Sequence, residues 1–124
     1  MHETTMNDVL DDDEARALRA QRIIDAVAAI PRGRVASYSA IAARAGYPGR
    51  ARLIGRVLGD APNRLDLPWH RVLRADGKIG IPVGTRGYRE QCRRLKAEGV
   101  VVKDGRVPMS AFGLDHDLDR AIWG

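Results

Sequence analysis

The sequence predicts a mainly α, winged-helix-like fold, and three observations lead to that prediction. Three segments in the first half of the chain have helical apolar spacing, and the tight connector AGYPG joins the second to the third. A fourth helical segment, YREQCRRLKAEGV, follows later. Two Asp-Gly pairs, at 76–77 and 104–105, lie between short apolar runs, which is typical of β-hairpin turns. Helices followed by short β-hairpins are the outline of a winged helix.

The length of 124 residues predicts one domain with a single modest core. We expect residues 1–12 to be a disordered tail and residues 13–124 to form the domain. The sequence has neither an apolar run of membrane-spanning length nor a secretory leader, so we expect a cytoplasmic protein without a membrane partner. A single cysteine excludes an intramolecular disulfide, and the three histidines lack zinc-ligand spacing, so no metal is expected.

The charge of the chain is unevenly distributed. The net charge is +5, yet acidic residues gather at both ends, in NDVLDDDEA and DHDLD, and leave residues 32–106 strongly basic. A basic middle fits a polyanionic partner such as nucleic acid, and it equally fits simple solubility. Charge alone leaves both interpretations open.

The first helix is predicted from Glu14 to about Ala29, where Pro31 and Gly33 stop it. Its apolar residues have approximately helical spacing: Leu18, Ile23, Val27 and Ile30. The second helix is expected to have Ser37 as its N-cap and Gly46 as its stop. The third is expected from about Pro48, a favourable first-turn residue, to Gly59. The second and third helices form a candidate helix-turn-helix.

The third helix has two unlike faces. One carries its apolar side chains, Leu53, Ile54, Val57 and Leu58. The opposite face carries Arg52, Gly55, Arg56 and Gly59. Small residues between arginines allow a helix backbone to approach a surface closely while the cations meet phosphate, although an ordinary solvated face remains the alternative.

After the third helix, DAPNRLDLP is expected to be a loop, and HRVLRADGKIGI a strand, an Asp76-Gly77 turn and a returning strand. The fourth helix is expected to end at Gly99, with its inner side formed by Tyr88, Cys92 and Leu95. The segment VVVKDGRVPM is predicted to be a second hairpin.

Few residues could carry out chemistry. His70 and Glu98 would make two thirds of a nucleophilic triad, but the nucleophile is missing, and a purely structural His70 is equally consistent. Ser37 and Ser39 are better explained by helix capping. Cys92 precedes Glu98 by six residues on one helix, so the two should point in different directions, and a buried, inert thiol is the simpler interpretation.

The pentapeptide PWHRV resembles the PCHRV signature of the 6-O-alkylguanine-DNA alkyltransferases, with Trp69 in place of the cysteine that accepts the alkyl group. That replacement marks the alkyltransferase-like proteins of the family. The resemblance extends from about Ile23 to Val102 and includes three further segments: IPRGRVASYSAIAARAG, PGRARLIGRVLGDAP and LKAEGV. It implies the DNA-binding fold of the alkyltransferase C-terminal domain, without a cofactor.

The resemblance also implies a function. Family members bind duplex DNA through the minor groove and rotate a 6-O-alkylguanine nucleotide out of the stack. Tyr38 matches the tyrosine that promotes rotation, Arg52 the arginine finger that fills the vacancy, and Ala51 and Gly55 the small positions that enter the groove. The full expected DNA-binding set is Tyr38, Arg50, Ala51, Arg52, Gly55 and Arg56. The expected lesion pocket is Tyr38, Trp69, His70, Val83, Gly84 and Thr85.

Three positions depart from the alkyltransferase pattern. Ala61 replaces an asparagine that helps to fix the turn near the acceptor cysteine, and Pro82 and Val83 replace a tyrosine and a serine of the pocket loop. An indole has no nucleophilic lone pair, so transfer to Trp69 is excluded. Trp69, His70 and Glu98 are therefore expected to be a vestigial site, in which the last two residues brace the pocket or retain unused chemistry.

The resemblance thus predicts a monomeric, non-enzymatic, nucleoid-associated DNA damage sensor that hands lesions to nucleotide excision repair proteins. Two alternatives remain. One is an active alkyltransferase that uses Cys92. The other is a winged-helix transcription regulator, which would read base edges with residues such as Asn or Gln on the third helix, where there is none.

Overall fold

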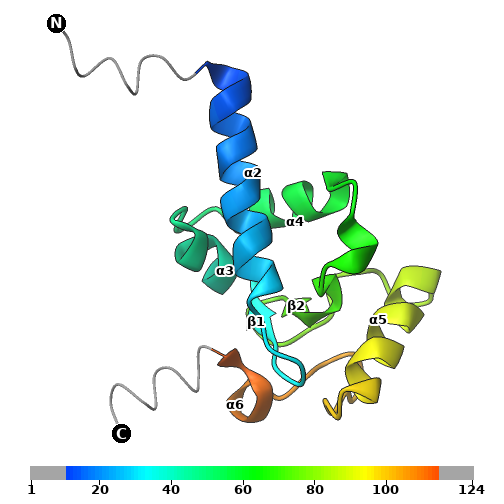
Figure 1. The fold of residues 1–124 in the computed structure, drawn as a ribbon. Coiled ribbons are helices and arrows are strands. Elements are labelled where there is room, and N and C mark those ends of the chain that lie inside the picture. Colours follow the sequence, from blue (N-terminus) through cyan, green and yellow to red (C-terminus); the bar gives the residue numbers. More distant parts are fainter. Residues whose placement is uncertain (1–10, 115–124) are drawn as a thin grey trace, which may run out of the picture.

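The computed structural model describes residues 11–114, and Figure 1 shows their arrangement. The helices and strands are α2 (Asp12–Ala28), β1 (Ala36–Ser37), α3 (Tyr38–Ala45), α4 (Ala51–Asp60), the 3-10 turns η1 (Arg64–Asp66) and η2 (Trp69–Arg71), β2 (Val72–Leu73), α5 (Arg86–Ala97) and α6 (Met109–Phe112). The N-terminal half of α2 projects from the body, while α3 and α4 pack against its other half (Figure 1). This confirms the mainly α prediction. No helix within residues 11–114 is long and apolar enough to span a membrane.

Helix α2 begins earlier than the expected Glu14. The Asp11 side chain caps it by accepting a hydrogen bond of 2.7 Å from the Glu14 backbone N–H. Three acidic residues in the first turn also favour a helix start there, since carboxylates interact well with the positive end of the helix dipole. Asp11 and Asp12 therefore belong to the helix rather than to the expected tail, and residues 1–10 of that tail, like the acidic DHDLD segment, lie outside the described residues.

The helix-turn-helix follows the prediction at α3 and departs from it at α4. Ser37 caps α3 by accepting from the Ala40 N–H at 3.0 Å, and Gly46 ends it with a φ of 98°. Helix α4 begins at Ala51 and not near Pro48. Gly49 has a φ of 81°, which a right-handed helix does not allow, so the connector extends to Arg50.

The strand at Val72–Leu73 is present, but the partner expected for it was wrong. It pairs in parallel with β1, Ala36 opposite Val72 and Ser37 opposite Leu73. The Asp76-Gly77 turn forms as expected, with the Gly77 N–H donating to the Arg74 carbonyl at 2.8 Å. Lys78 still pairs across the turn, since its carbonyl accepts from the Arg74 N–H at 2.9 Å, but the next residue does not continue the pairing: the Ile79 N–H donates to the Gly105 carbonyl at 2.9 Å. Both strand residues are fully buried, which suits a strand between two layers better than an exposed hairpin.

The second hairpin turn is confirmed. Lys103 and Arg106 exchange backbone hydrogen bonds of 2.9 and 3.0 Å around a two-residue loop. Asp104 and Gly105 have φ angles of 53° and 72°, the pair of positive values that a type I′ turn requires. Helix α5 also ends as expected, because Gly99, with a φ of 83°, turns the chain away. The short helix α6 was not predicted.

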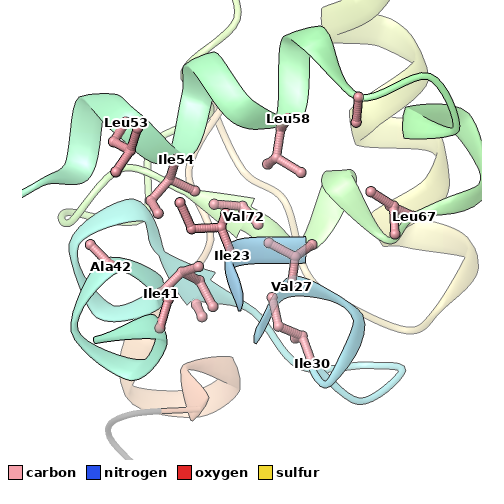
Figure 2. Close-up of a cluster of buried hydrophobic side chains, with 13 residues drawn as sticks. Ile23, Val27, Ile30, Ile41, Ala42, Leu53, Ile54, Leu58, Leu67 and Val72 are labelled. Atoms are coloured by element: carbon pink, nitrogen blue, oxygen red, sulfur yellow. The ribbon is translucent and has the colours of Figure 1, made fainter. Parts of the chain in front are cut away.

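The core consists of two clusters. The first lies between α2, α3 and α4, and Figure 2 shows Ile23 and Val27 of α2 meeting Ile41, Ile54 and Val72 there. The second gathers side chains from the later part of the chain: Val35, Leu73, Ile79, Leu95, Val100 and Val107, with Tyr88 and Cys92 packed against them. Strand β2 contributes Val72 to one cluster and Leu73 to the other, so it joins the helix-turn-helix to the second half of the fold.

Candidate nucleic-acid interface and pocket

Helix α4 presents the two faces that the sequence predicts. Its buried side is formed by Leu53, Ile54 and Leu58. Its exposed residues are Arg52, Gly55, Arg56, Gly59 and Asp60, and Arg50, just before the helix, is exposed as well. Ala51 and Val57 are half-buried. The exposed face is therefore cationic and partly free of side chains, a surface that suits close approach to a polyanion.

A cavity of about 330 Å³ opens beside this face. Its lining residues are Tyr38, Gly55, Leu58, Gly59, Arg64, Trp69 and Ile81. Tyr38 begins α3, the two glycines lie one helical turn apart on α4, and Trp69 begins the η2 turn. A Cβ built on Gly55 would lie 3.9 Å from the Tyr38 Cε1 atom, so the missing side chain leaves room between α4 and the tyrosine ring. The cavity thus connects the helix-turn-helix to the PWHRV segment.

Of the six residues expected in the pocket, Tyr38 and Trp69 line this cavity. His70 is only 6% exposed and lies behind it. The other three belong to the loop before α5, outside the lining. Val83 is 78% exposed, and Thr85 caps α5 by accepting from the Tyr88 N–H at 3.2 Å.

Four lining residues were missed by the sequence interpretation. Gly59 could have been found, because it lies four residues after Gly55 on the same helix face. Leu58, Arg64 and Ile81 come from the end of α4, the η1 turn and the loop before α5, and nothing in their local sequence indicates that they meet.

The indole of Trp69 is held on two sides. The His70 ring meets it edge-on, with 6.1 Å between ring centroids and 85° between planes. The Arg94 guanidinium carbon lies 5.5 Å from the Trp69 ring centroid, a cation–π contact, and the Arg94 Nε donates to Glu90 at 2.7 Å. These contacts fix one wall of the cavity.

Behind Trp69 lies a polar network centred on the Glu98 carboxylate. Its Oε2 atom is 2.7 Å from His70 Nε2 and 2.7 Å from Arg71 Nη2, and its Oε1 atom accepts from the Gly33 N–H at 3.0 Å. Arg71 also donates from Nη1 to the Ile30 carbonyl at 2.7 Å. Gln91, another residue missed in the sequence, donates to the carbonyls of His70 at 3.1 Å and Val72 at 3.2 Å. The network ties the PWHRV turn to the loop after α2 and to α5.

Burial and hydrogen bonding together determine the charges in this network. Burial alone would raise the pKa of Glu98, but hydrogen bonds from Arg71, His70 and Gly33 outweigh it and lower that pKa to about 2. Burial lowers the pKa of His70, against the opposing effect of its hydrogen bond to Glu98. A neutral His70 must then carry its proton on Nε2, because an ionised carboxylate can only accept.

Within residues 11–114, two buried side-chain polar atoms have no hydrogen-bond partner: Nδ1 of His70 and Nε1 of Trp69. With the proton of His70 on Nε2, its Nδ1 is a free acceptor. Chemically, the site therefore holds a potential base but no nucleophile at position 69.

Cys92 lies apart from this site. It lines a different hollow, formed with residues of α5 and the second hairpin: Tyr88, Arg89, Arg93, Lys96, Val102, Asp104 and Gly105. The structure therefore does not bring the thiol to the cavity beside Trp69. Residues 11–114 also contain no group of three or more His, Cys, Asp or Glu side chains that could hold a metal ion.

The chain is similar in sequence to proteins of one family. Residues 19–100 match the family described as 6-O-methylguanine DNA methyltransferase, DNA binding domain. The chain is 40% identical over 84 residues to a DNA base-flipping protein of Vibrio parahaemolyticus, an alignment that covers 67% of this chain and 82% of the relative. It is 36% identical over 81 residues to alkyltransferase-like protein 1 of Schizosaccharomyces pombe, covering 65% of this chain and 75% of that protein.

Solved structures agree. The S. pombe Atl1 protein, in complex with damaged DNA containing O6-carboxymethylguanine, superimposes with a TM-score of 0.69 at 29% identity, over 77% of this chain and 93% of Atl1. The Mycobacterium tuberculosis OGT protein in complex with DNA gives a TM-score of 0.54 at 35% identity, over 64% of this chain and 48% of that one.

Proposed function

This chain belongs to the family of 6-O-methylguanine DNA methyltransferase DNA-binding domains, and we propose that it recognises 6-O-alkylguanine in duplex DNA by flipping the nucleotide, without transferring the alkyl group. A relative named a DNA base-flipping protein, and the likeness to Atl1 bound to DNA containing O6-carboxymethylguanine, support both parts of the proposal.

The observation that carries the proposal is the identity of the residue in the cavity. Trp69 lines it where the PCHRV signature has the acceptor cysteine, and the one cysteine of the chain lines another hollow. A base that enters this cavity meets an aromatic wall and no thiolate. Aromatic side chains bind a flipped base by stacking, so the site is suited to binding and not to covalent capture.

The residue roles follow from position. Arg52 on the exposed face of α4 is proposed to enter the duplex and fill the space of the flipped nucleotide. Tyr38, at the cavity edge, is proposed to crowd the adjacent phosphate. Gly55 and the half-buried Ala51 let α4 approach the minor groove, and Arg50 and Arg56 contact phosphates. His70 and Glu98 brace the turn that carries Trp69.

The loop residues Val83, Gly84 and Thr85 keep a place in this proposal as the outer rim of the pocket. The Thr85 hydroxyl donates to the Pro82 carbonyl at 2.7 Å, which closes the loop just before α5. Because Ile81 lines the cavity and the loop follows it directly, a base inside the cavity would bring the loop close to DNA.

Flipping favours damaged sites on energetic grounds. Extruding a nucleotide costs a few kcal/mol and costs least where the base is poorly paired, as an alkylated guanine is. Retention of the complex with the flipped nucleotide would then flag the lesion for nucleotide excision repair proteins. We place this activity in the cytoplasm, at the nucleoid, and assign it to a monomer.

Two measurements test the proposal together. Matched duplexes that contain guanine or 6-O-methylguanine are titrated with the protein, and the protein mass is then measured. We expect tighter binding to the methylated duplex, a one-to-one complex and an unchanged mass. A mass gain of one methyl group would contradict the proposal, and Cys92→Ser would then test whether that thiol is the acceptor. A preference for one unmodified sequence would instead favour a regulator.

A further inference from the structure

Among the described residues that line the cavity beside Trp69, Arg64 is the one with a cationic side chain, in an otherwise apolar and aromatic lining. Leu58 and Ile81 are aliphatic, Trp69 and Tyr38 are aromatic, and the remaining positions are glycines. The other polar side-chain atoms of these residues are the Tyr38 hydroxyl and the buried Nε1 of Trp69, so Arg64 supplies the charge of this lining. A polar group set in an apolar pocket fixes which ligand is preferred.

The backbone of Arg64 is fixed while its side chain is exposed. Arg64 begins the η1 turn, where its N–H donates to the Ala61 carbonyl at 3.2 Å and its carbonyl accepts from the Leu67 N–H at 3.2 Å. These two bonds hold its Cα between the end of α4 and the turn that carries Trp69. The guanidinium can therefore reach the cavity without rearrangement of the fold.

Arg64 also differs from the other two arginines around Trp69 in its partners. Arg71 is bound to Glu98 and Arg94 to Glu90, so both cations are already neutralised. Among residues 11–114, the Arg64 side chain has no hydrogen bond or ion pair to another side chain or to the backbone. Its five N–H donors are free for a ligand.

We propose that Arg64 selects lesions whose O6 substituent carries an anionic group, such as a carboxylate. The proposal rests on the proposed function, which brings the alkylated base into this cavity. A guanidinium offers two parallel N–H donors that match a carboxylate, and it stays charged at any physiological pH. The apolar side chains beside the guanidinium lower the local dielectric and so strengthen that pairing. A methyl group gains nothing from the same cation.

The test compares three duplexes of one sequence, with guanine, O6-methylguanine or O6-carboxymethylguanine at the same position. The native protein should bind the carboxymethyl duplex more tightly than the methyl duplex. Arg64→Ala should weaken binding to the carboxymethyl duplex about five- to tenfold and leave the methyl duplex nearly unchanged. Arg64→Lys keeps the positive charge but loses the two parallel N–H donors. Its affinity for the carboxymethyl duplex should lie between that of the native protein and that of Arg64→Ala. Arg22→Ala, an exposed arginine on α2, is the control for net charge.

The outcomes separate this inference from the function it rests on. If no duplex with a lesion is preferred over guanine, the proposed function fails. If both lesions are preferred but Arg64→Ala leaves their ratio unchanged, only the role of Arg64 fails. If Arg64→Ala weakens all three duplexes equally, with a shallower salt dependence, Arg64 contacts a backbone phosphate and the proposal is overturned. Far-UV circular dichroism of each variant verifies its fold.

Discussion

The Nε2 atom of His70 lies 2.7 Å from the Oε2 atom of Glu98, so the histidine donates to a carboxylate that is ionised throughout the physiological range. The same carboxylate binds Arg71 and the Gly33 N–H. Glu98 thus joins three segments that are distant in the sequence. This supplies a structural reason for a histidine and a glutamate behind a pocket without a nucleophile: they hold the Trp69 turn in place.

Replacing Glu98 should therefore reduce stability strongly. Glu98→Gln leaves the mostly buried Arg71 cation without its anionic partner, and breaking a buried pair in this way costs about 3 kcal/mol. Urea denaturation at pH 7 measures the free energy of unfolding. Glu90→Gln is the matched control, because Glu90 pairs with Arg93 and Arg94 near the surface and should cost much less. Equal losses in the two variants would contradict the bracing role.

Stability should also fall on mild acidification because of His70. Its pKa is lowered from 6.5 in the folded state, so as the pH falls below 6.5 the unfolded chain takes up a proton that the folded chain resists. The stabilising contribution is present above pH 6.5 and is lost as the pH drops towards the folded-state pKa.

His70→Gln removes this contribution, and any other histidine is common to both proteins. The free energy of unfolding, measured between about pH 7.5 and pH 5.5, should fall more steeply for the native chain than for the variant. Parallel curves would show that His70 titrates alike in both states. The Glu98 carboxylate does not interfere, because its pKa is about 2 in the folded chain and its ordinary pKa of 4.5 also lies below this pH range.

The two exposed arginines of α4 should have different effects on DNA binding. Arg52→Ala should reduce the ratio of lesion to undamaged affinity more than it reduces affinity for undamaged duplex, because a finger acts only once the nucleotide is out. Arg56→Ala should weaken both duplexes alike and lower the slope of log affinity against log salt by about 1. Fluorescence anisotropy at several salt concentrations measures both quantities. If the two variants had the same affinity ratio and the same salt dependence, the role of Arg52 in filling the space of the flipped nucleotide would be contradicted.

Gly55→Ala should raise the stability of the fold and at the same time weaken lesion binding. A Cβ at this helical position meets only Tyr38 Cε1 at 3.9 Å, so the folded chain accommodates it, and alanine in a helix interior stabilises by about 0.5–1 kcal/mol relative to glycine. The same methyl group narrows the cavity and keeps α4 away from DNA. We expect a higher melting temperature and weaker lesion binding.

Gly87→Ala in α5 is the control for this variant, because Gly87 does not line the cavity and a Cβ there meets Ile81 side-chain atoms at 3.5 Å, an ordinary contact. Because Ile81 itself lines the cavity, this variant should lower lesion affinity less than Gly55→Ala does. Undiminished lesion binding by Gly55→Ala would contradict the close approach of α4.

Local rules predicted those parts of the fold that local interactions determine. Ser37 and Gly46 bound α3 as capping rules require, and Asp104-Gly105 forms the tight turn that this dipeptide favours. The predicted start of α4 was wrong because Gly49 adopts a positive φ, which overrides the preference of Pro48 for a first helical turn.

Contacts between residues that are far apart in the sequence could not be predicted from local sequence rules. The partner of Val72–Leu73 lies 36 residues earlier, at Ala36–Ser37, and only the assembled core selects it. Arg71 reaches Glu98 across 27 positions, and Arg64 meets Ile81 at the cavity only after the whole domain has folded. The resemblance identified Tyr38 and Trp69 by their motifs, whereas Arg64 belongs to no motif.

The parallel pairing of β1 with β2 has a mechanical consequence. Tyr38 directly follows β1, and the turn of Trp69 directly precedes β2. Because β1 and β2 are paired, the backbone positions of these two cavity-lining residues are fixed by the same pair of strands. Their separation is set when the core folds, before any DNA arrives. If the cavity between Tyr38 and Trp69 keeps this width, the conformational change needed for binding is that of the DNA. For a cavity held in this way, the proposed function makes the ease with which a base pair opens one determinant of the sites that are bound.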